Sequence, residues 1–160
     1  MAVSEQHHHL PLPAFDKPPH LLIVVAPYYK DIADNLIEGA KAAIAATGAT
    51  CEVAEVPGAL EIPTAIRLAR AADKYDGYVA LGCVIRGETS HYDYVCGESA
   101  RGLQDLAIDR RLAIGYGILT TDNDSQAWVR ARRSEKNKGR DAAEACLAMI
   151  ALKRRFAGAP

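Results

Sequence analysis

The chain has 160 residues, of which 49% are apolar and 24% are charged, and its formal net charge is −1. This length suits one domain with its own core, and the composition is globular rather than disordered or fibrous. A net charge near zero excludes a surface field that would gather nucleic acid or an anionic membrane, so any anion must be bound locally. The sequence has no long apolar run and no signal peptide, so we expect no membrane segment and a cytoplasmic location.

The first 19 residues differ in composition from the rest of the chain. They contain His7, His8 and His9, followed by several prolines. Because proline fixes φ and lacks a backbone donor, we expect a flexible tail over 1–19, followed by a single domain over 20–160. Metal binding by the three histidines competes with a chance cluster, and the chance cluster is the better interpretation.

From residue 20 onward, short apolar runs alternate with longer segments of helical period. In 31–47, for example, Ile32, Leu36 and Ile44 fall on one helical face, and Gly48 then ends the helix. The same reasoning predicts strands over 21–26, 50–56, 77–82 and 112–118, and helices over 31–47, 60–73, 92–108, 123–132 and 138–156.

This alternation predicts an α/β fold. Short connections between strands and helices imply a four-stranded parallel sheet covered on both faces, a three-layer α/β/α sandwich of the flavodoxin-like, doubly wound class. Ligands of such sheets bind outside the carboxyl ends of the strands. The connections expected to carry chemistry are therefore 27–29, 56–63, 83–91 and 119–123.

Several kinds of site are absent from the sequence. Cys51, Cys83, Cys96 and Cys146 form no C-x-x-C pair, so we expect reduced and mostly buried thiols and no bound metal. Motifs for nucleoside triphosphates, dinucleotides and the nucleophile elbow are also missing. The sequence therefore gives no sign of these three kinds of site.

The connection 83–91 has the strongest chemical logic. Gly87 permits a sharp turn, and Ser90 with Asp93 forms a capping box that begins the next helix. Free backbone N–H groups at the positive end of a helix dipole make a site for phosphate. The alternative is an ordinary helix cap that faces water, and the two readings are evenly balanced on this segment alone.

His91 falls in the first turn of that helix, where the dipole favours the neutral imidazole. A neutral histidine accepts a proton and can return it, so His91 is the candidate for proton transfer. Most histidines at such positions are only solvated. The neighbouring anion site and the end of a strand raise His91 above that expectation.

Other candidates are less specific. Glu61, between Pro57 and Pro63, either accepts hydrogen bonds from ligand hydroxyls or simply favours a helix start. Tyr28 and Tyr29 either stack on a planar heterocycle or pack against the domain.

A further tyrosine and a basic cluster complete the candidates. Tyr116, judged alone, is more often a core residue than a ligand contact. The basic cluster usually indicates a solvated face, although one arginine in it could clamp a phosphate. Its members are Arg130, Arg132, Arg133, Lys136 and Lys138.

Four motifs together resemble the lumazine synthase family over residues 21–154. They are VPGALEIP at 56–63, GCVIRGETSHYDYV at 82–95, GILTTDN at 117–123 and NKG at 137–139. The resemblance implies condensation of 5-amino-6-(D-ribitylamino)uracil with 3,4-dihydroxy-2-butanone 4-phosphate to 6,7-dimethyl-8-ribityllumazine, the penultimate step of riboflavin synthesis. This reaction needs no redox cofactor or metal. A carrier or receptor that binds a flavin or lumazine without turnover is the alternative.

The resemblance also implies residue roles. His91 is the proton-transfer residue, and Tyr116 matches an aromatic residue of the adjoining subunit. The ribitylaminouracil is expected to contact Tyr28, Ala59, Leu60, Glu61, Cys83, Val84, Ile85 and Tyr116, and the butanone phosphate Glu88, Thr89, Arg130 and Lys138.

Finally, the resemblance implies an assembly. The family forms homopentamers with active sites between adjacent subunits, and a possible hand-off of product to riboflavin synthase follows from the pathway. The linker 133–137 lacks the glycine typical of members that build sixty-subunit shells, which favours an isolated pentamer over a decamer or shell. Pro27-Tyr28-Tyr29 departs from the usual motif, so either tyrosine is a candidate for stacking on the pyrimidine.

Overall fold

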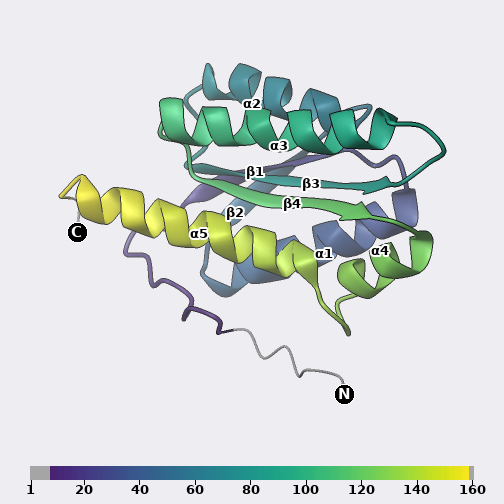
Figure 1. Cartoon of the computed structure of the whole chain (residues 1–160). Helices are drawn as coiled ribbons and strands as arrows, with labels where there is room; N and C mark the ends of the chain where they lie inside the picture. The colour runs from purple at the N-terminus through teal and green to yellow at the C-terminus, as the bar shows by residue number, and fades with distance from the viewer. Residues whose placement is uncertain (1–7, 159–160) are drawn as a thin grey trace.

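A computed structural model describes residues 8–158, which form a four-stranded parallel sheet in the order β2-β1-β3-β4. Helices α2 and α3 cover one face of the sheet, and α1, α4 and α5 cover the other (Figure 1). The predicted three-layer α/β/α class is confirmed. The elements are β1 (His20–Val25), α1 (Lys30–Ala46), β2 (Thr50–Glu55), the 3₁₀ turn η1 (Ala59–Glu61), α2 (Ile62–Arg70), β3 (Gly77–Ile85), α3 (His91–Asp109), β4 (Ile114–Thr121), α4 (Asp124–Ala131) and α5 (Lys138–Phe156).

Two strands run further than the sequence predicted. β3 continues through Cys83, Val84 and Ile85, which pair with Leu119, Thr120 and Thr121 of β4. The prediction ended these strands at 82 and 118, yet the β-branched residues that follow each end are suited to strands. As a result, Cys83 to Ile85 lie on the sheet and not in the connection that follows it.

The helix predicted over 60–73 is shorter. Residues 59–61 form the separate turn η1, and Pro63 lies in the first turn of α2, where its missing N–H costs nothing. The helix ends at Arg70, and Asp73 adopts the left-handed conformation with φ of 49°.

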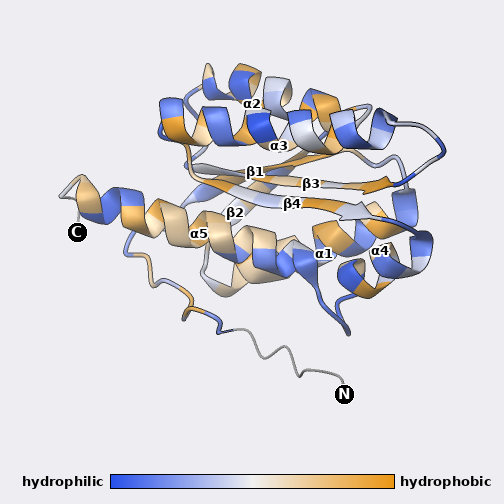
Figure 2. Ribbon diagram, viewed as in Figure 1, coloured by the Kyte–Doolittle hydropathy of each residue, from blue (hydrophilic) through white to orange (hydrophobic). Residues whose placement is uncertain are grey.

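The core has two parts, one on each face of the sheet. Along β1, Leu21 and Ile23 pack toward α1 and α5, whereas Leu22 and Val24 pack toward α2 and α3. Strands buried on both faces are continuously apolar, as the central strands in Figure 2 are.

Helix α5 lies unusually close to its neighbours. A Cβ atom on Gly115 of β4 would collide with the backbone carbonyl of Ala142, and one on Gly139 would collide with that of Leu36 in α1. Both positions therefore require glycine, and the close packing fixes where α5 begins.

Part of the predicted tail lies against the domain. Phe15 packs on the core, and Arg154 of α5 donates a hydrogen bond to the carbonyl of Lys17 at 2.7 Å. The rest of the predicted tail includes residues 1–7, which lie outside the described part of the chain. No described helix has the length and apolar character needed to cross a membrane.

Candidate active site

A cavity of about 480 Å³ lies at the carboxyl ends of β1, β2 and β3. This is the edge at which a parallel sheet is expected to bind ligands. Its lining joins segments that are far apart in the sequence: Ala26, Tyr28, Tyr29, Pro57, Gly58, Ala59, Leu60, Glu61, Cys83, Val84, Ile85, Gly87, Thr89, His91, Tyr92 and Val95.

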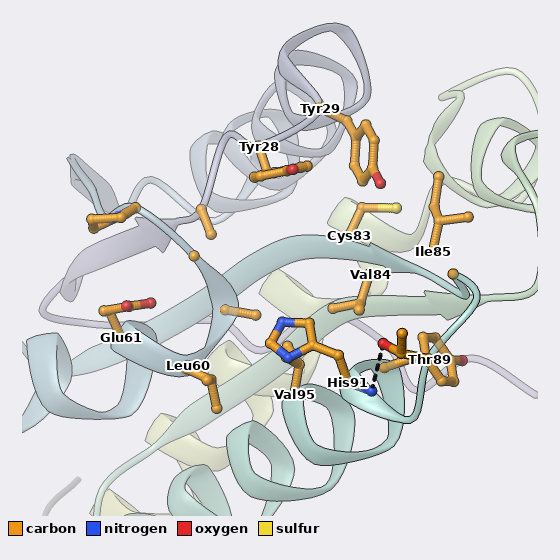
Figure 3. A pocket seen from close by; sticks show the side chains of 16 residues that line it. Tyr28, Tyr29, Leu60, Glu61, Cys83, Val84, Ile85, Thr89, His91 and Val95 are labelled. Atoms are coloured by element: carbon orange, nitrogen blue, oxygen red, sulfur yellow. Dashed lines mark hydrogen bonds between the residues drawn. The ribbon is translucent and has the colours of Figure 1, made fainter.

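The walls of this cavity differ in character. Figure 3 shows Tyr28 and Tyr29 on one side, the end of β3 beneath them, and His91 opposite, with Glu61 and Leu60 to the side. The surfaces are mostly apolar or aromatic, and few polar groups converge on the space. Such a lining suits a planar heterocycle held by a few directional contacts.

His91 is the first residue of α3, and its ring points into the cavity (Figure 3). Its backbone N–H donates a hydrogen bond to Oγ1 of Thr89 at 3.3 Å. The side chain is exposed, so a bound molecule can reach the ring nitrogens. The ring is therefore placed to exchange protons with a molecule in the cavity.

The predicted capping box is wrong. Ser90 occupies the N-cap, but its side chain accepts no capping hydrogen bond within the described residues, because its backbone is helical, with φ of −70° and ψ of −2°. A capping side chain needs extended backbone to reach the first turn. Thr89 supplies the local hydrogen bond to His91 in its place.

The backbone donors just before α3 remain available. Among the described residues, the N–H groups of residues 87–90 have no intramolecular hydrogen-bond partner. They adjoin the positive end of a helix of 19 residues. This arrangement can hold an anion beside His91.

The structure explains the glycine at position 87 in a different way from the predicted sharp turn. Its φ is not in the left-handed range, and an added Cβ would meet nothing within 4 Å. Gly87 lines the cavity, so the missing side chain leaves room for a ligand to approach the backbone.

The two tyrosines after β1 take different positions. Their rings meet edge to face, with centroids 5.0 Å apart. Tyr28 is 75% exposed, while Tyr29 packs against the core and burial raises its pKa. Tyr28 therefore has the free ring face that stacking requires.

The end of β3 forms the floor of the cavity. Burial, together with the nearby Asp124 carboxylate, raises the pKa of the Cys83 thiol to about 11, so this thiol is neutral at ordinary pH. All four cysteines are free, but only Cys146 is fully buried, which corrects the prediction of mostly buried thiols.

Ala59, Leu60 and Glu61 form η1 and line a third side of the cavity. The Glu61 carboxylate folds back toward Gly58, where an added Cβ would lie 3.1 Å from Oε2. Glu61 is exposed and can accept hydrogen bonds from ligand hydroxyls.

Three predicted site residues lie elsewhere. Tyr116, Arg130 and Lys138 line a second cavity of about 300 Å³, which follows residues 116–120 along the free edge of β4. Tyr116 is 45% exposed and is not a core residue. Arg130 donates a hydrogen bond to the carbonyl of Gln126 at 3.0 Å, and Lys138 pairs with Asp141 at 3.1 Å.

Glu88 is the remaining predicted residue, and it does not line either cavity. Its neighbours Gly87 and Thr89 do line the larger one. A contact between Glu88 and the phosphate, which the family resemblance implied, therefore depends on its backbone N–H and not on its carboxylate.

Sequence reasoning missed Tyr92 and Val95, which also line the larger cavity. They follow His91 by one and four positions on α3, and the i, i+4 spacing of Val95 places it on the same helix face. That spacing was the available signal. No comparable spacing pointed to Tyr92.

Among the described residues, one group of potential metal ligands combines His9 and Glu144, which line neither cavity, with Asp141, which lines the second cavity. Atoms of His9, Asp141 and Glu144 lie within 4.8 Å of one another. Asp141 is already paired with Lys138 and Arg140, both at 3.1 Å, so its charge is largely compensated.

Comparison with known proteins gives a consistent result. The family model described as 6,7-dimethyl-8-ribityllumazine synthase matches residues 18–154. The chain is 57% identical to 6,7-dimethyl-8-ribityllumazine synthase 1 of Rhizobium meliloti over 145 residues, covering 88% of this chain and 95% of the relative. It is 59% identical to the synthase of the same name from Agrobacterium fabrum over 145 residues, covering 88% and 98%.

Proposed function

Since the chain belongs to the 6,7-dimethyl-8-ribityllumazine synthase family, we propose that it condenses 5-amino-6-(D-ribitylamino)uracil with 3,4-dihydroxy-2-butanone 4-phosphate. The products are 6,7-dimethyl-8-ribityllumazine, phosphate and two waters. The observation that carries the proposal is the position of His91 beside unpaired N–H groups in a mostly apolar cavity of about 480 Å³.

The first step joins the two substrates. The 5-amino group of the uracil attacks the ketone, and loss of water gives an imine. His91 reaches the cavity from the first turn of α3, where it can take protons from the attacking nitrogen and deliver them to the leaving water. The open ring face of Tyr28 stacks on the pyrimidine, and Glu61 binds ribityl hydroxyls.

The second step expels phosphate. A proton is removed from the carbon next to the one that bears the ester, and the C–O bond to phosphate breaks. The N–H groups of residues 87–89 stabilise the departing anion together with the dipole of α3. Elimination leaves an enol, and transfer of its hydroxyl proton to the carbon that carried the phosphate gives a methyl group and a new ketone. Attack by the ribityl-bearing nitrogen on this ketone, with loss of the second water, closes the ring.

Arg130 and Lys138 act on the phosphate from an adjacent subunit in this proposal. They lie with Tyr116 in the second cavity, along an edge of the sheet that no described strand covers. If that edge meets the larger cavity of a neighbour, the two half-sites complete each other. A closed ring of such heterologous contacts is a cyclic oligomer, and we propose the homopentamer.

The proposal includes two features of cellular context. Four free thiols suit a reducing compartment, which supports a cytoplasmic location. The second feature is transfer of the product to riboflavin synthase, which follows from placing the proposed reaction in riboflavin synthesis.

The test is a steady-state assay with both substrates, which follows the fluorescence of the product. The expected result is turnover that depends on each substrate and releases one phosphate per lumazine formed. Tight binding of the lumazine without any turnover would replace the synthase with a carrier or receptor.

A further inference from the structure

The connection between β3 and α3 carries the anion-binding donors, yet burial does not hold it in place. All residues from 86 to 91 are exposed. Gly87 adds no side-chain contact, since an added Cβ would meet nothing within 4 Å. Something other than packing must keep the N–H groups and His91 directed at the cavity.

Arg86 makes the contacts that could do this. Its backbone N–H donates to the carbonyl of Thr121 at 2.9 Å, which ends the pairing of β3 with β4. Its Nε donates to Oδ1 of Asp122, also at 2.9 Å, and Nη1 lies 3.6 Å from Oδ1 of Asp93. The guanidinium also lies over the ring of Tyr92, 4.3 Å from its centroid.

These contacts join three parts of the chain. Asp122 belongs to the connection after β4, while Tyr92 and Asp93 belong to the first turn of α3. A planar guanidinium can engage two carboxylates and stack on a ring at once, which an ammonium group cannot do. Arg86 therefore links both ends of the exposed connection to a neighbouring strand end.

Asp122, which anchors Arg86 just after β4, is itself held in place. The N–H of Asp122 donates to the side chain of Gln126 at 2.8 Å, and the N–H of Gln126 donates to the capping Asn123 at 2.9 Å. Contacts at the start of α4 thus fix the position of Asp122. Asp122 in turn holds Arg86, and Arg86 holds the connection before α3.

Arg86 does not line the larger cavity, although Ile85 and Gly87 on either side of it do. Exposed ion pairs contribute little to global stability, so a structural role alone explains the network poorly. We propose that Arg86 is a positioning residue, which holds the N–H groups of residues 87–89 and the His91 ring toward the substrates without touching them. This inference rests on the proposed function for the identity of the anion.

The experiment compares R86Q, D122N and the double variant R86Q/D122N in the full chain. Steady-state constants are measured for each substrate, the affinity for inorganic phosphate by titration calorimetry, and the exchange of amide hydrogens at residues 86–91 by mass spectrometry. R70Q is the matched control, because Arg70 forms an exposed pair with Asp73, 3.1 Å long, at the end of α2 that points away from the cavity.

We expect R86Q to raise the KM for the butanone phosphate and the Kd for inorganic phosphate about fivefold to fiftyfold and to lower kcat about tenfold. The KM for the uracil should change less than about twofold. The backbone amides at positions 86 and 91, which are hydrogen-bonded to Thr121 and Thr89, should exchange faster. D122N keeps the arginine charge but removes its anchor, so it should reproduce most of the defect. The double variant should be no worse than R86Q, since the two residues act as one unit.

R86K tests the geometry separately from the charge. Lysine retains the positive charge but cannot bridge both carboxylates over Tyr92, so we expect it to recover less than half of the lost kcat. Full recovery by R86K, or normal phosphate affinity in D122N with a loss in R86Q, would show direct charge attraction and overturn positioning. Wild-type constants in R86Q would also overturn it.

Failure of the proposed function gives a different pattern. In that case the wild-type chain makes no lumazine, while the phosphate affinity and amide exchange of the variants still report on Arg86. Unchanged exchange at 86–91 in R86Q would reject the positioning role whatever the wild-type activity.

Discussion

His91 and Arg130 of one chain face two different cavities, one at the amino end of α3 and the other along the free edge of β4. The proposed mechanism needs both side chains on the same substrate. A site that uses both therefore takes them from two copies of the chain, and this can be tested by mixing variants.

H91A and R130A chains should complement each other. In an oligomer formed from equal amounts of both, a site is intact when His91 comes from an R130A chain and Arg130 from an H91A neighbour. Random mixing then gives about a quarter of the wild-type sites. Coexpression with two purification tags, followed by the lumazine assay, measures this fraction. Activity no higher than that of the separate variants would place both residues in one chain's site.

H91A should lower kcat about a hundredfold or more while leaving the melting temperature unchanged, because the exposed ring contributes no core packing. H9A is the matched control, because His9 is also an exposed histidine but lies outside both cavities. Equal activity of H91A and H9A would remove His91 from the mechanism.

Tyr28 and Tyr29 should respond differently to truncation. Y28A removes the exposed ring and should raise the KM for the uracil about tenfold, the usual worth of one stacked base, with little change in stability. Y29A removes a ring that packs against the core, so it should lower the free energy of unfolding by about 2 kcal/mol or more. Kinetic constants and denaturant unfolding separate the two. If only Y29A raised the KM for the uracil, the stacking role would pass to Tyr29.

Cys83 should resist alkylation despite its place in the cavity. Its pKa is raised to about 11, so the reactive thiolate is scarce at neutral pH and becomes abundant only as the pH approaches that value. Site-resolved mass spectrometry after a short iodoacetamide pulse at several pH values measures this. Unfolding the chain in denaturant should restore reactivity near pH 8.5, the ordinary range of a thiol. Rapid alkylation of Cys83 in the folded chain at pH 7 would contradict its raised pKa.

Y78F should stabilise the fold by about 1 kcal/mol, because the Tyr78 hydroxyl is buried and, within the described residues, has no hydrogen-bond partner. Thermal or urea unfolding measures the change. Y75F is the control: the neighbouring Tyr75 is only partly buried, with its ring centroid 5.5 Å from Nζ of Lys74, so loss of its hydroxyl should stabilise nothing. A lower stability for Y78F would indicate that a buried water satisfies the hydroxyl.

Much of the fold could be predicted because the relevant signal is local. Among the described residues, apolar periodicity and glycine stops located each strand and α-helix but not the turn η1, and strand ends were placed too early at Gly82 and Ile118. The true ends of these strands are set by pairing with the neighbouring strand, as in the pairing of Ile85 with Thr121. Sequence periodicity does not contain that information.

The candidate site was predicted less evenly. Residues on the strand connections, such as His91 and Glu61, were found because chain order places them at one edge of the sheet. The capping box failed because Ser90 adopts helical backbone, which its residue type does not reveal. The separation of Arg130 from His91 follows from where α4 lies relative to β4, and that depends on packing between distant segments.

The edge of β4 that no described strand pairs with would link solubility to turnover in the proposed oligomer. If the chain forms the proposed ring, a subunit that leaves it would lose the arginine and lysine of its neighbour. It would also expose a row of backbone groups with a half-exposed tyrosine among them. Dilution would therefore produce a species that is both inactive and prone to pair with other strands. Selection against aggregation and selection for catalysis would then favour the same subunit contact.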